Sequence, residues 1–350
     1  MNYASSNAKR HHHFLSALTL SLILCCAAGL GGCATPIFKH EPPPSPLTGE
    51  ALLIDDDVYN QALHLIHNAN HTLYIEQMAL DDPVILNEII TKAQAGVEIR
   101  ILLDRWQPEN GPTITLLKNN NISAQYYPTE KGQYHRQKLI IADNETALFL
   151  STPWTDSPSL FSSLALIVTG DTVQKALDMF ARDWQYTTTL GLNSARTADK
   201  SVTEPERVTL TSTVGMKNLI LSYIESACQT IDIETQQLSG DEDIISALAA
   251  AQKRGCKVRI ILDSSCLETT PNTLKTLADV HIEYRYFNTP GKILSRNFAV
   301  FDTRSLVYTS SAWTYNTFVI NYEGALAVPS PAAAQKGADI FQLDWESSFQ

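Results

Sequence analysis

The chain has 350 residues, of which 44% are hydrophobic and 18% are charged. This length suits two domains of ordinary size, and the apolar fraction excludes a largely disordered chain. The formal net charge of −11 disfavours nucleic acid as a partner, because nucleic acid binders neutralise phosphates with basic patches.

The N-terminal stretch has the layout of a secretory signal. Lys9 and Arg10 precede an apolar run over residues 14–30, and small residues lead into Cys33. That ending is similar to a bacterial lipobox. We therefore expect residues 1–32 to be a lipoprotein signal peptide and Cys33 to be lipidated. An uncleaved membrane anchor and simple secretion are the alternatives.

The residues after Cys33 suit a protein held at a membrane by its lipid anchor. Residues 33–48 are polar and rich in proline, which predicts an extended tether. Ala34 occupies the position at which an aspartate often retains lipoproteins in the inner membrane. We therefore expect an exported lipoprotein of the outer membrane that faces the periplasm.

An internal repeat organises the remainder of the chain. Gly96 and Asp104 recur 159 positions later as Gly255 and Asp263, within similar apolar phrases. A unit of this length is a domain-sized half and not a solenoid repeat. The repeat predicts a first half over residues 49–187 and a second over 207–350, joined by a polar linker over 188–206.

Each half shows the same succession of helical and strand patterns. Apolar spacing predicts a helix, a short strand, a second helix and a buried strand, and such a unit is typical of an α/β fold. Asp81 is expected to cap the second helix of the first half, and Ser239 or Asp241 that of the second half. The predicted segments are a first helix over 58–69, strands over 73–76, 99–103, 138–142, 146–150 and 164–168, and a second helix over 84–94, with counterparts in the second half.

A motif in the first half indicates the family. Lys138 to Asp143 read K-x4-D, and Ser151 follows. This resembles the phospholipase D superfamily, whose pattern is H-x-K-x4-D, then G-S-x-N and later N-x-E. The resemblance covers nearly all of residues 49–350. It implies two repeats, each a mostly parallel mixed sheet flanked by helices, related by a pseudo-two-fold axis.

In that superfamily, one histidine attacks phosphorus, the other protonates the leaving group, and lysines and asparagines hold the phosphate oxygens. Here the two histidine positions are Arg136 and Ser295, and the second lysine position is Asn297. The resemblance thus implies a degenerate site. Its phosphate-binding residues would be Arg136, Lys138, Ser151, Asn297, Ser310 and Asn321, with Asp143, Asp302 and Glu323 as supporting carboxylates.

His135 lies one residue before the expected histidine position. On a regular strand its side chain points away from Lys138, whereas a β-bulge at Gln137 would bring the two together. His135 and Lys138 are therefore the candidate catalytic pair if the strand is bulged. Even so, the second half offers no partner, since its nearest histidine, His281, lies 14 residues before Ser295.

Two functions follow from these residues. The first is a non-catalytic phospholipase D-like lipoprotein that binds a phosphate-bearing ligand or a protein partner. The second is a divergent phosphodiesterase or phosphatidyltransferase acting on phospholipid. Positions 136 and 295 favour the first, so the sequence leaves enzymatic activity open. It predicts no cofactor and no metal, and it does not specify an oligomeric state.

The remaining patterns carry weaker hypotheses. Cys228 and Cys256 flank predicted neighbouring parallel strands, so a disulfide between them is expected, with three separate thiols as the alternative. Four carboxylates end buried strands, and loop hydrogen bonding is favoured for them over cleft lining; they are Glu76, Glu234, Asp104 and Asp263.

Overall fold

The computed structural model describes residues 51–155, 158–192 and 208–350. The expected signal and tether lie outside the described residues, as does most of the expected linker, 188–206. Within the described ranges, no helix is both long and apolar enough to cross a membrane.

The first half is built on a seven-stranded sheet with the order β1-β8-β6-β5-β2-β3-β4. Strands β2, β3 and β4 run parallel, and the others join antiparallel. The strands are β1 (Leu52–Ile54), β2 (Thr72–Gln77), β3 (Glu98–Asp104), β4 (Ser123–Tyr127), β5 (Leu139–Ala142), β6 (Thr146–Leu150) and β8 (Leu164–Thr169). The helices are α1 (Asp56–Asn68), α2 (Pro83–Gln94), α3 (Asn110–Asn119) and α4 (Asp171–Thr188).

The second half repeats this plan with the sheet order β13-β12-β10-β15-β16-β18-β9. Its strands are β9 (Thr209–Ser212), β10 (Thr230–Thr235), β12 (Lys257–Leu262), β13 (Glu283–Tyr286), β15 (Phe298–Phe301), β16 (Ser305–Thr309) and β18 (Gly324–Val328). Its helices are α5 (Val214–Ser226), α6 (Glu242–Lys253), α7 (Cys266–Thr269), α8 (Pro271–Asp279) and α9 (Pro331–Ser347). The short strands β11 (Leu238–Ser239) and β17 (Trp313–Thr314) pair beside this sheet.

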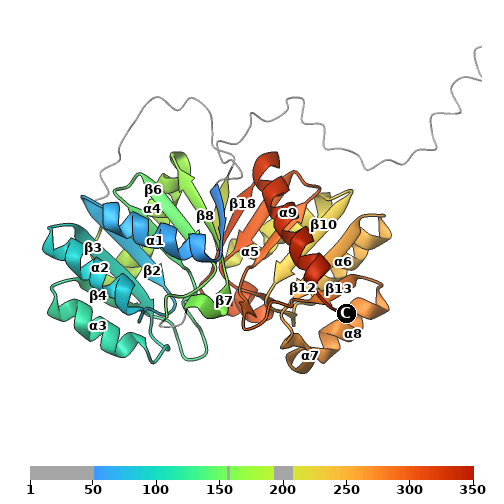
Figure 1. The fold of residues 1–350 in the computed structure, drawn as a ribbon, viewed down its shortest axis with the longest axis horizontal. Helices are drawn as coiled ribbons and strands as arrows, with labels where there is room; N and C mark the ends of the chain where they lie inside the picture. The colour runs from blue at the N-terminus through green and yellow to red at the C-terminus, as the bar shows by residue number, and fades with distance from the viewer. Residues whose placement is uncertain (1–50, 156–157, 193–207) are drawn as a thin grey trace, which may run out of the picture. The chain divides into compact units, whose positions relative to one another are not determined.

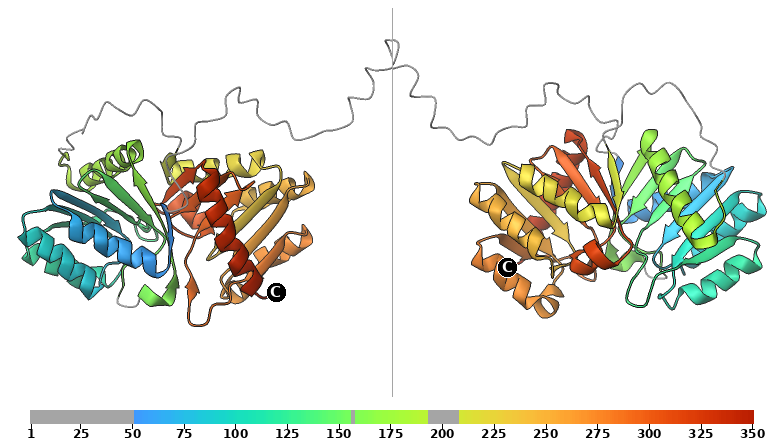
Figure 2. Two further views of the ribbon diagram at one scale, coloured as in Figure 1. Left: turned by 45° about the horizontal axis from the view of Figure 1, so that its top comes forward. Right: turned by 180° about the vertical axis from the view of Figure 1, so that it is seen from behind.

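The α/β fold with two repeats is confirmed. The two sheets lie side by side with helices on both faces (Figures 1 and 2). Helices α1 and α9 lie on the near side in Figure 1, whereas α4 and α5 lie on the near side in the view from behind (Figure 2, right). One apolar core contains side chains from both sheets, such as Leu166 of β8 and Leu326 of β18. The halves therefore share a continuous buried interior.

Local signals explain where the second helix of each half begins. The side chain of Asp82 accepts hydrogen bonds from the N–H groups of Val84 and Ile85, while Pro83 occupies the first helical turn. The expectation that Asp81 caps this helix is wrong by one residue, because Pro83 fits the position directly after the cap. Asp241 caps α6 as expected, accepting from Ile244 N.

Short backbone pairings fasten the halves to each other. Strand β7 (Phe161–Ser162) of the first half pairs in parallel with β14 (Ile293–Leu294) of the second. At the equivalent place, His135 of the first half forms a parallel bridge with Tyr322 of the second. These two pairings position the segments that carry the motif residues, and we call the region between them the junction.

Candidate functional site

The motif aspartates hold turns at the far ends of β5 and β15. Asp143 accepts hydrogen bonds from the backbone N–H groups of Asn70, His71 and Thr72, at 2.7–3.1 Å. Asp302 receives the same three bonds from Cys228, Gln229 and Thr230. Asp143 therefore orients the loop before β2, and Asp302 the loop before β10.

The junction places the first-half motif directly on the second-half N-x-E segment. Tyr322 N donates to Tyr134 O, and Arg136 N donates to Tyr322 O, both at 2.8 Å. Asn321 Oδ1 accepts from Tyr134 N at 3.2 Å. Backbone pairing thus brings the first-half motif segment next to the N-x-E segment of the second half.

The pairing also fixes the first-half counterpart of N-x-E. Asp55 N donates to Ser163 O and Ser163 N donates to Asp55 Oδ1. In the same way, Thr213 N donates to Glu323 O and Glu323 N to Thr213 Oγ1. Ser295 N donates to Ser162 O at 3.1 Å. The counterpart is therefore residues 161–163. A strict offset of 159 would give residues 162–164, so the repeat contains a one-residue shift between Asp143 and this segment.

Polar motif residues gather on one side of the junction. Lys138 Nζ donates to Ser310 O at 2.6 Å, across the two halves. Ser310 Oγ donates to Glu323 Oε2 at 2.5 Å, and Asn321 Nδ2 to Glu323 Oε1 at 3.4 Å. All four side chains are buried. Burial lowers the pKa of Lys138 to about 8, although the Glu323 carboxylate acts to raise it.

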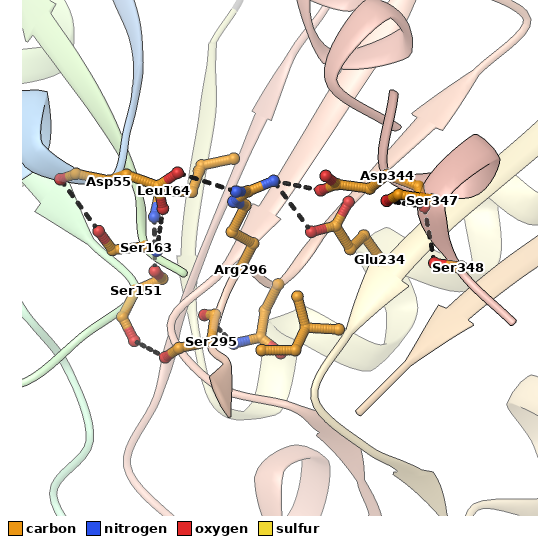
Figure 3. Close-up of polar contacts among 12 residues, drawn as sticks. Asp55, Ser151, Ser163, Leu164, Glu234, Ser295, Arg296, Asp344, Ser347 and Ser348 are labelled. Atoms are coloured by element: carbon orange, nitrogen blue, oxygen red, sulfur yellow. Dashed lines mark hydrogen bonds and ion pairs between the residues drawn. The ribbon is translucent and has the colours of Figure 1, made fainter. Parts of the chain in front are cut away.

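The other side of the junction carries neutral residues. Ser295 Oγ donates to Ser151 O at 3.3 Å, joining the halves (Figure 3). The amide of Asn297 is bonded within the second half: its Oδ1 accepts from Thr235 and Gln236, and its Nδ2 donates to Ser295 O. Asn297 therefore braces the end of β10.

Arg136, at the first histidine position, is half-buried beside Lys138. Lys138 Nζ also donates to Arg136 O at 3.1 Å. The guanidinium of Arg136 lies 5.3 Å from the centre of the Tyr134 ring. Within the described part of the chain, its buried Nε has no hydrogen-bond partner. This nitrogen is therefore a buried donor whose hydrogen bond is not made among the described residues.

His135 lies in a separate cluster on the helix α4 side, which we call the His135 cluster. Its Nε2 is 3.3 Å from Glu76 Oε2, and its ring stacks against Tyr127 and Tyr322 at 4.4 and 5.2 Å between centroids. Tyr322 Oη donates to Asp183, and Arg182 Nη2 donates to Tyr322 Oη at 3.1 Å. The imidazole is fully buried and contacts these groups instead of the Lys138 ammonium.

Burial sets the protonation states in the His135 cluster. It lowers the pKa of His135 to about 4, although the Asp183 and Asp104 carboxylates act to raise it. Burial raises the pKa of Glu76 to about 8 and that of Asp183 to about 7. At neutral pH the imidazole is therefore neutral and Glu76 holds a proton.

The equivalent place in the second half holds the Arg296 cluster (Figure 3). Arg296 Nη1 pairs with Asp344 and, at 3.5 Å, with Glu234, while Nη2 pairs with Asp55 of the first half at 3.1 Å. Sequence reasoning missed this cluster, because Arg296 stands between two motif positions and its partners are distant in sequence. The matched pairs Glu76/Glu234 and Asp183/Asp344 were the available signal.

The strand-end carboxylates divide into two kinds. Asp104 accepts from Trp106 N and His135 N, and Asp263 accepts from Ser265 N and Leu294 N, which are the expected loop hydrogen bonds. Glu76 and Glu234 instead belong to the two buried clusters. In the described ranges, no three His, Cys, Asp or Glu side chains are arranged to hold a metal ion.

Cys228 and Cys256 lie at the same end of parallel neighbours, since Thr230 of β10 pairs with Lys257 of β12. This is the arrangement that the expected disulfide requires, and the bridge itself stays a prediction. Cys266 lies in α7 beyond the other end of β12, and its Sγ donates to Gln236 O at 3.3 Å.

Residues 62–184 and 220–345 match the family described as "Cardiolipin synthase, PLD-like domain". The chain belongs to the phospholipase D superfamily. Among curated relatives, it is 24% identical over 239 residues to cardiolipin synthase 2 of Bacillus anthracis, which covers 60% of this chain and 46% of that protein. It is 28% identical over 137 residues to phospholipase D of Rickettsia prowazekii, covering 39% of this chain and 64% of that protein.

This phospholipase D-like chain thus spans about half the length of the cardiolipin synthases that it matches. Solved structures agree on the two-repeat fold. Phosphatidylserine synthase of Haemophilus influenzae superposes with a TM-score of 0.64 at 13% identity, covering 86% of this chain and 87% of that one. Polyphosphate kinase of Porphyromonas gingivalis gives 0.62 at 14% identity, covering 88% and 50%.

Proposed function

We propose that this protein binds the phosphate of a phospholipid, or of a related phosphodiester, at the junction and does not turn it over. The observation that carries this proposal is the pair of residues at the two histidine positions, Arg136 and Ser295. A guanidinium can hold phosphate oxygens, but it is no nucleophile at neutral pH. Ser295 Oγ donates to the Ser151 carbonyl, and the hydrogen bonds of the described residues give it no base as a partner.

The binding half of the proposal rests on two adjacent cations. Arg136 offers a buried Nε without a partner in the described residues, and Lys138 adds a second positive charge. Charge-assisted hydrogen bonds to phosphate are about twice as strong as neutral ones. The phospholipid class is supported by the names of the relatives, cardiolipin synthase and phosphatidylserine synthase.

The absence of turnover rests on the state of His135. A covalent mechanism needs an accessible unprotonated nucleophile opposite a proton donor. The buried His135 ring is stacked on Tyr127 and Tyr322 and faces Glu76. The residue that matches it in the second half, Leu294, has no ionisable group.

Calorimetric titration of the protein with glycerophosphoglycerol, a soluble phosphodiester, tests the binding. We expect wild-type protein to bind and Arg136→Ala to lose about tenfold or more in affinity, because a charged donor is removed. Arg105→Ala is the matched control, since Arg105 is an exposed arginine of the same half that lies over Trp106. No binding by wild type, or equal binding by Arg136→Ala, would contradict the proposal.

We further propose that the protein is lipidated at Cys33 and held at the outer membrane, facing the periplasm. The apolar run, the lipobox-like ending and the tether over residues 33–48 support this. Cys33→Ser should move the protein out of the lipid-modified membrane fraction. An unchanged distribution, with the N-terminal stretch still attached, would contradict the proposal.

The second candidate is a divergent phosphodiesterase or phosphatidyltransferase. It is favoured by the retention of Lys138, Ser310, Asn321 and Glu323 as one polar group and by the enzymatic names of the relatives. It requires His135 to leave its cluster and reach the Lys138 ammonium.

A further inference from the structure

The two outer edge strands of the molecule, β4 and β13, are covered differently. Each ends the sheet order of its half, and the two lie at opposite ends of the molecule (Figure 1). An edge strand presents a row of unpaired N–H and C=O groups that can pair with another strand. Tyr126 of β4 pairs with Leu103 of β3. Tyr286 of β13 pairs with Leu262, the repeat counterpart of Leu103, so the two tyrosines occupy equivalent edge positions.

The C-terminal residues of the chain cover the edge at β13. Tyr286 N donates to Phe349 O at 2.8 Å, and Phe349 N donates to Tyr286 O at 3.1 Å. Beside this antiparallel bridge, Arg285 Nη1 donates to Trp345 O at 2.6 Å. The strand also carries Glu283, a charged residue of the kind that keeps exposed edges from pairing. As a result, only 5% of Tyr286 is exposed.

Helix α4 prevents the same arrangement in the first half. Counted from the matched tryptophans of the two last helices, the counterpart of Phe349 is Thr188. Thr188 is still helical, because α4 continues to it, whereas α9 ends at Ser347. The chain is therefore wound into the helix where it would have to be extended to reach β4. Within the described residues, no segment pairs with the outer side of β4.

The composition of β4 leaves this edge without the usual protection. Ser123 and Gln125 stand at the positions of the two charged residues of β13. The strand therefore has neither a charge nor a proline, the residues that keep edges from pairing. The helices that pack against it expose apolar side chains: 41% of Leu116 on α3 and 65% of Tyr186 on α4 are exposed. The Tyr186 ring lies 5.9 Å from that of Tyr127 at the end of β4.

We propose that β4 is a dimerisation edge and that it pairs antiparallel with β4 of a second copy of this chain. Two identical antiparallel strands are related by a two-fold axis, so each contact occurs twice. With the axis at Gln125, Tyr126 of one copy lies opposite Ala124 of the other, a large side chain against a small one.

The backbone of β4 suits this register. Tyr286 directs its N–H and C=O groups outward to Phe349, so its counterpart Tyr126 directs the same groups away from β3, as does Ala124 two residues earlier. Each pair of Tyr126 with Ala124 of the second copy can therefore exchange two hydrogen bonds. The inference does not depend on the proposed function, because β4 lies at the end of its sheet that is remote from the second half.

Sedimentation velocity of the purified full chain in a non-ionic detergent tests the proposal. We expect wild-type protein to form a dimer as its concentration rises. Gln125→Glu and Gln125→Lys should each weaken dimerisation by about fivefold, because like charges then face each other across the axis. Gln61→Glu is the matched control, since Gln61 is a half-buried glutamine on α1, which packs on α2, β1 and β5.

Mixing the two Gln125 variants in equal amounts should restore the dimer, because the carboxylate of one copy then faces the ammonium of the other. A defect in folding cannot be rescued in this way, so the mixture separates the interface from stability. A wild type that stays monomeric, a dimer that neither Gln125 variant weakens, a loss equal to that in Gln61→Glu, or a mixture that fails to dimerise would each overturn the proposal.

Discussion

The His135 cluster and the Arg296 cluster occupy equivalent places in the two halves, yet they neutralise their carboxylates differently. Each contains a buried glutamate near the end of the first parallel strand, β2 or β10, and an aspartate on the last helix. In the second half a guanidinium pairs with both acids. In the first half the position of Arg296 is taken by Gln137, and Glu76 retains a proton beside a neutral imidazole.

The two halves therefore keep the glutamate and the aspartate at matched positions, whereas the residues that contact these acids differ. Burial raises the pKa of the buried glutamate in both halves. What differs is the partner: the Arg296 guanidinium pairs with the Asp344 and Asp55 carboxylates, whereas His135 contacts Glu76 as a neutral ring that stacks on two tyrosines. The pH dependence of stability should therefore include a contribution from Glu76 that a substitution of this residue can isolate. Stability of the second half should depend on one cation.

The largest expected effect is the loss of that cation. Arg296→Met should destabilise the protein by about 3–5 kcal/mol at neutral pH, because it leaves the Asp344 and Asp55 carboxylates near each other without the cation that pairs with both. Urea unfolding measures the change. The structural counterpart, Gln137→Met, is the matched control. Both polar ends of the Gln137 amide lack a hydrogen-bond partner in the described residues, so an apolar side chain there should cost less than about 1 kcal/mol.

Similar losses of unfolding free energy in Arg296→Met and Gln137→Met would contradict this contrast, since the ion pairs of Arg296 would then add nothing beyond ordinary packing at that position.

The next largest expected effect on the unfolding free energy comes from the expected disulfide between Cys228 and Cys256, which would occur in the second half alone. The first half has Asn70 and Val97 where Cys228 and Cys256 stand. Oxidised protein should therefore lose about 3 kcal/mol of unfolding free energy on reduction, or in Cys228→Ser. Thiol counting under denaturing, non-reducing conditions gives the direct readout. Cys266→Ser should leave the bridge intact, and three reactive body thiols in oxidised protein would contradict it.

A smaller effect concerns pH. Between about pH 6.5 and 8, Glu76 is ionised in the unfolded chain and protonated in the folded one, because burial raises its pKa to about 8. The folded state then binds more protons, so the unfolding free energy should fall by about 1–2 kcal/mol as pH rises through this window. Glu76→Gln should remove the share of the fall that Glu76 contributes.

The exposed Glu145→Gln is the control for this measurement. Glu234 contributes a change of the same sign, since burial raises its pKa as well, so the decisive quantity is the difference between wild type and Glu76→Gln. Below pH 6.5 His135 opposes this trend, because burial lowers its pKa to about 4 and protonation there favours unfolding, while Glu76, Asp183 and Glu234 continue to contribute to the fall. Parallel pH curves for wild type and Glu76→Gln would contradict the assignment.

Much of the fold could be predicted from the sequence, because periodic apolar runs and a constant repeat offset are local or pairwise signals. The strands around residues 99–103, 146–150 and 164–168 and both second helices lie within a residue or two of their predicted bounds. The turn at Asp143 followed from the repeat with Asp302. The one-residue shift before Ser163 could not be predicted, since it is visible only in the hydrogen bonds to Asp55 and Thr213.

The site was less predictable than the fold. Motif spacing identified Arg136, Lys138 and Glu323, but it could not show that the Lys138 ammonium would cross to Ser310. The orientation of the His135 ring is set by its contacts with Glu76, Tyr127 and Tyr322, three residues from separate strands and loops. Side-chain partnerships of this kind arise from tertiary packing, which a sequence pattern does not encode locally.

The most direct test of the central claim, binding without turnover, is release of nitrophenol from bis(p-nitrophenyl) phosphate by the full-length protein. The structure predicts that wild type releases no nitrophenol above a heat-denatured blank and that His135→Ala is indistinguishable from it, because the buried imidazole faces Glu76. Sustained release by wild type that is lost in His135→Ala would contradict the account and show that His135 reaches the junction as a nucleophile.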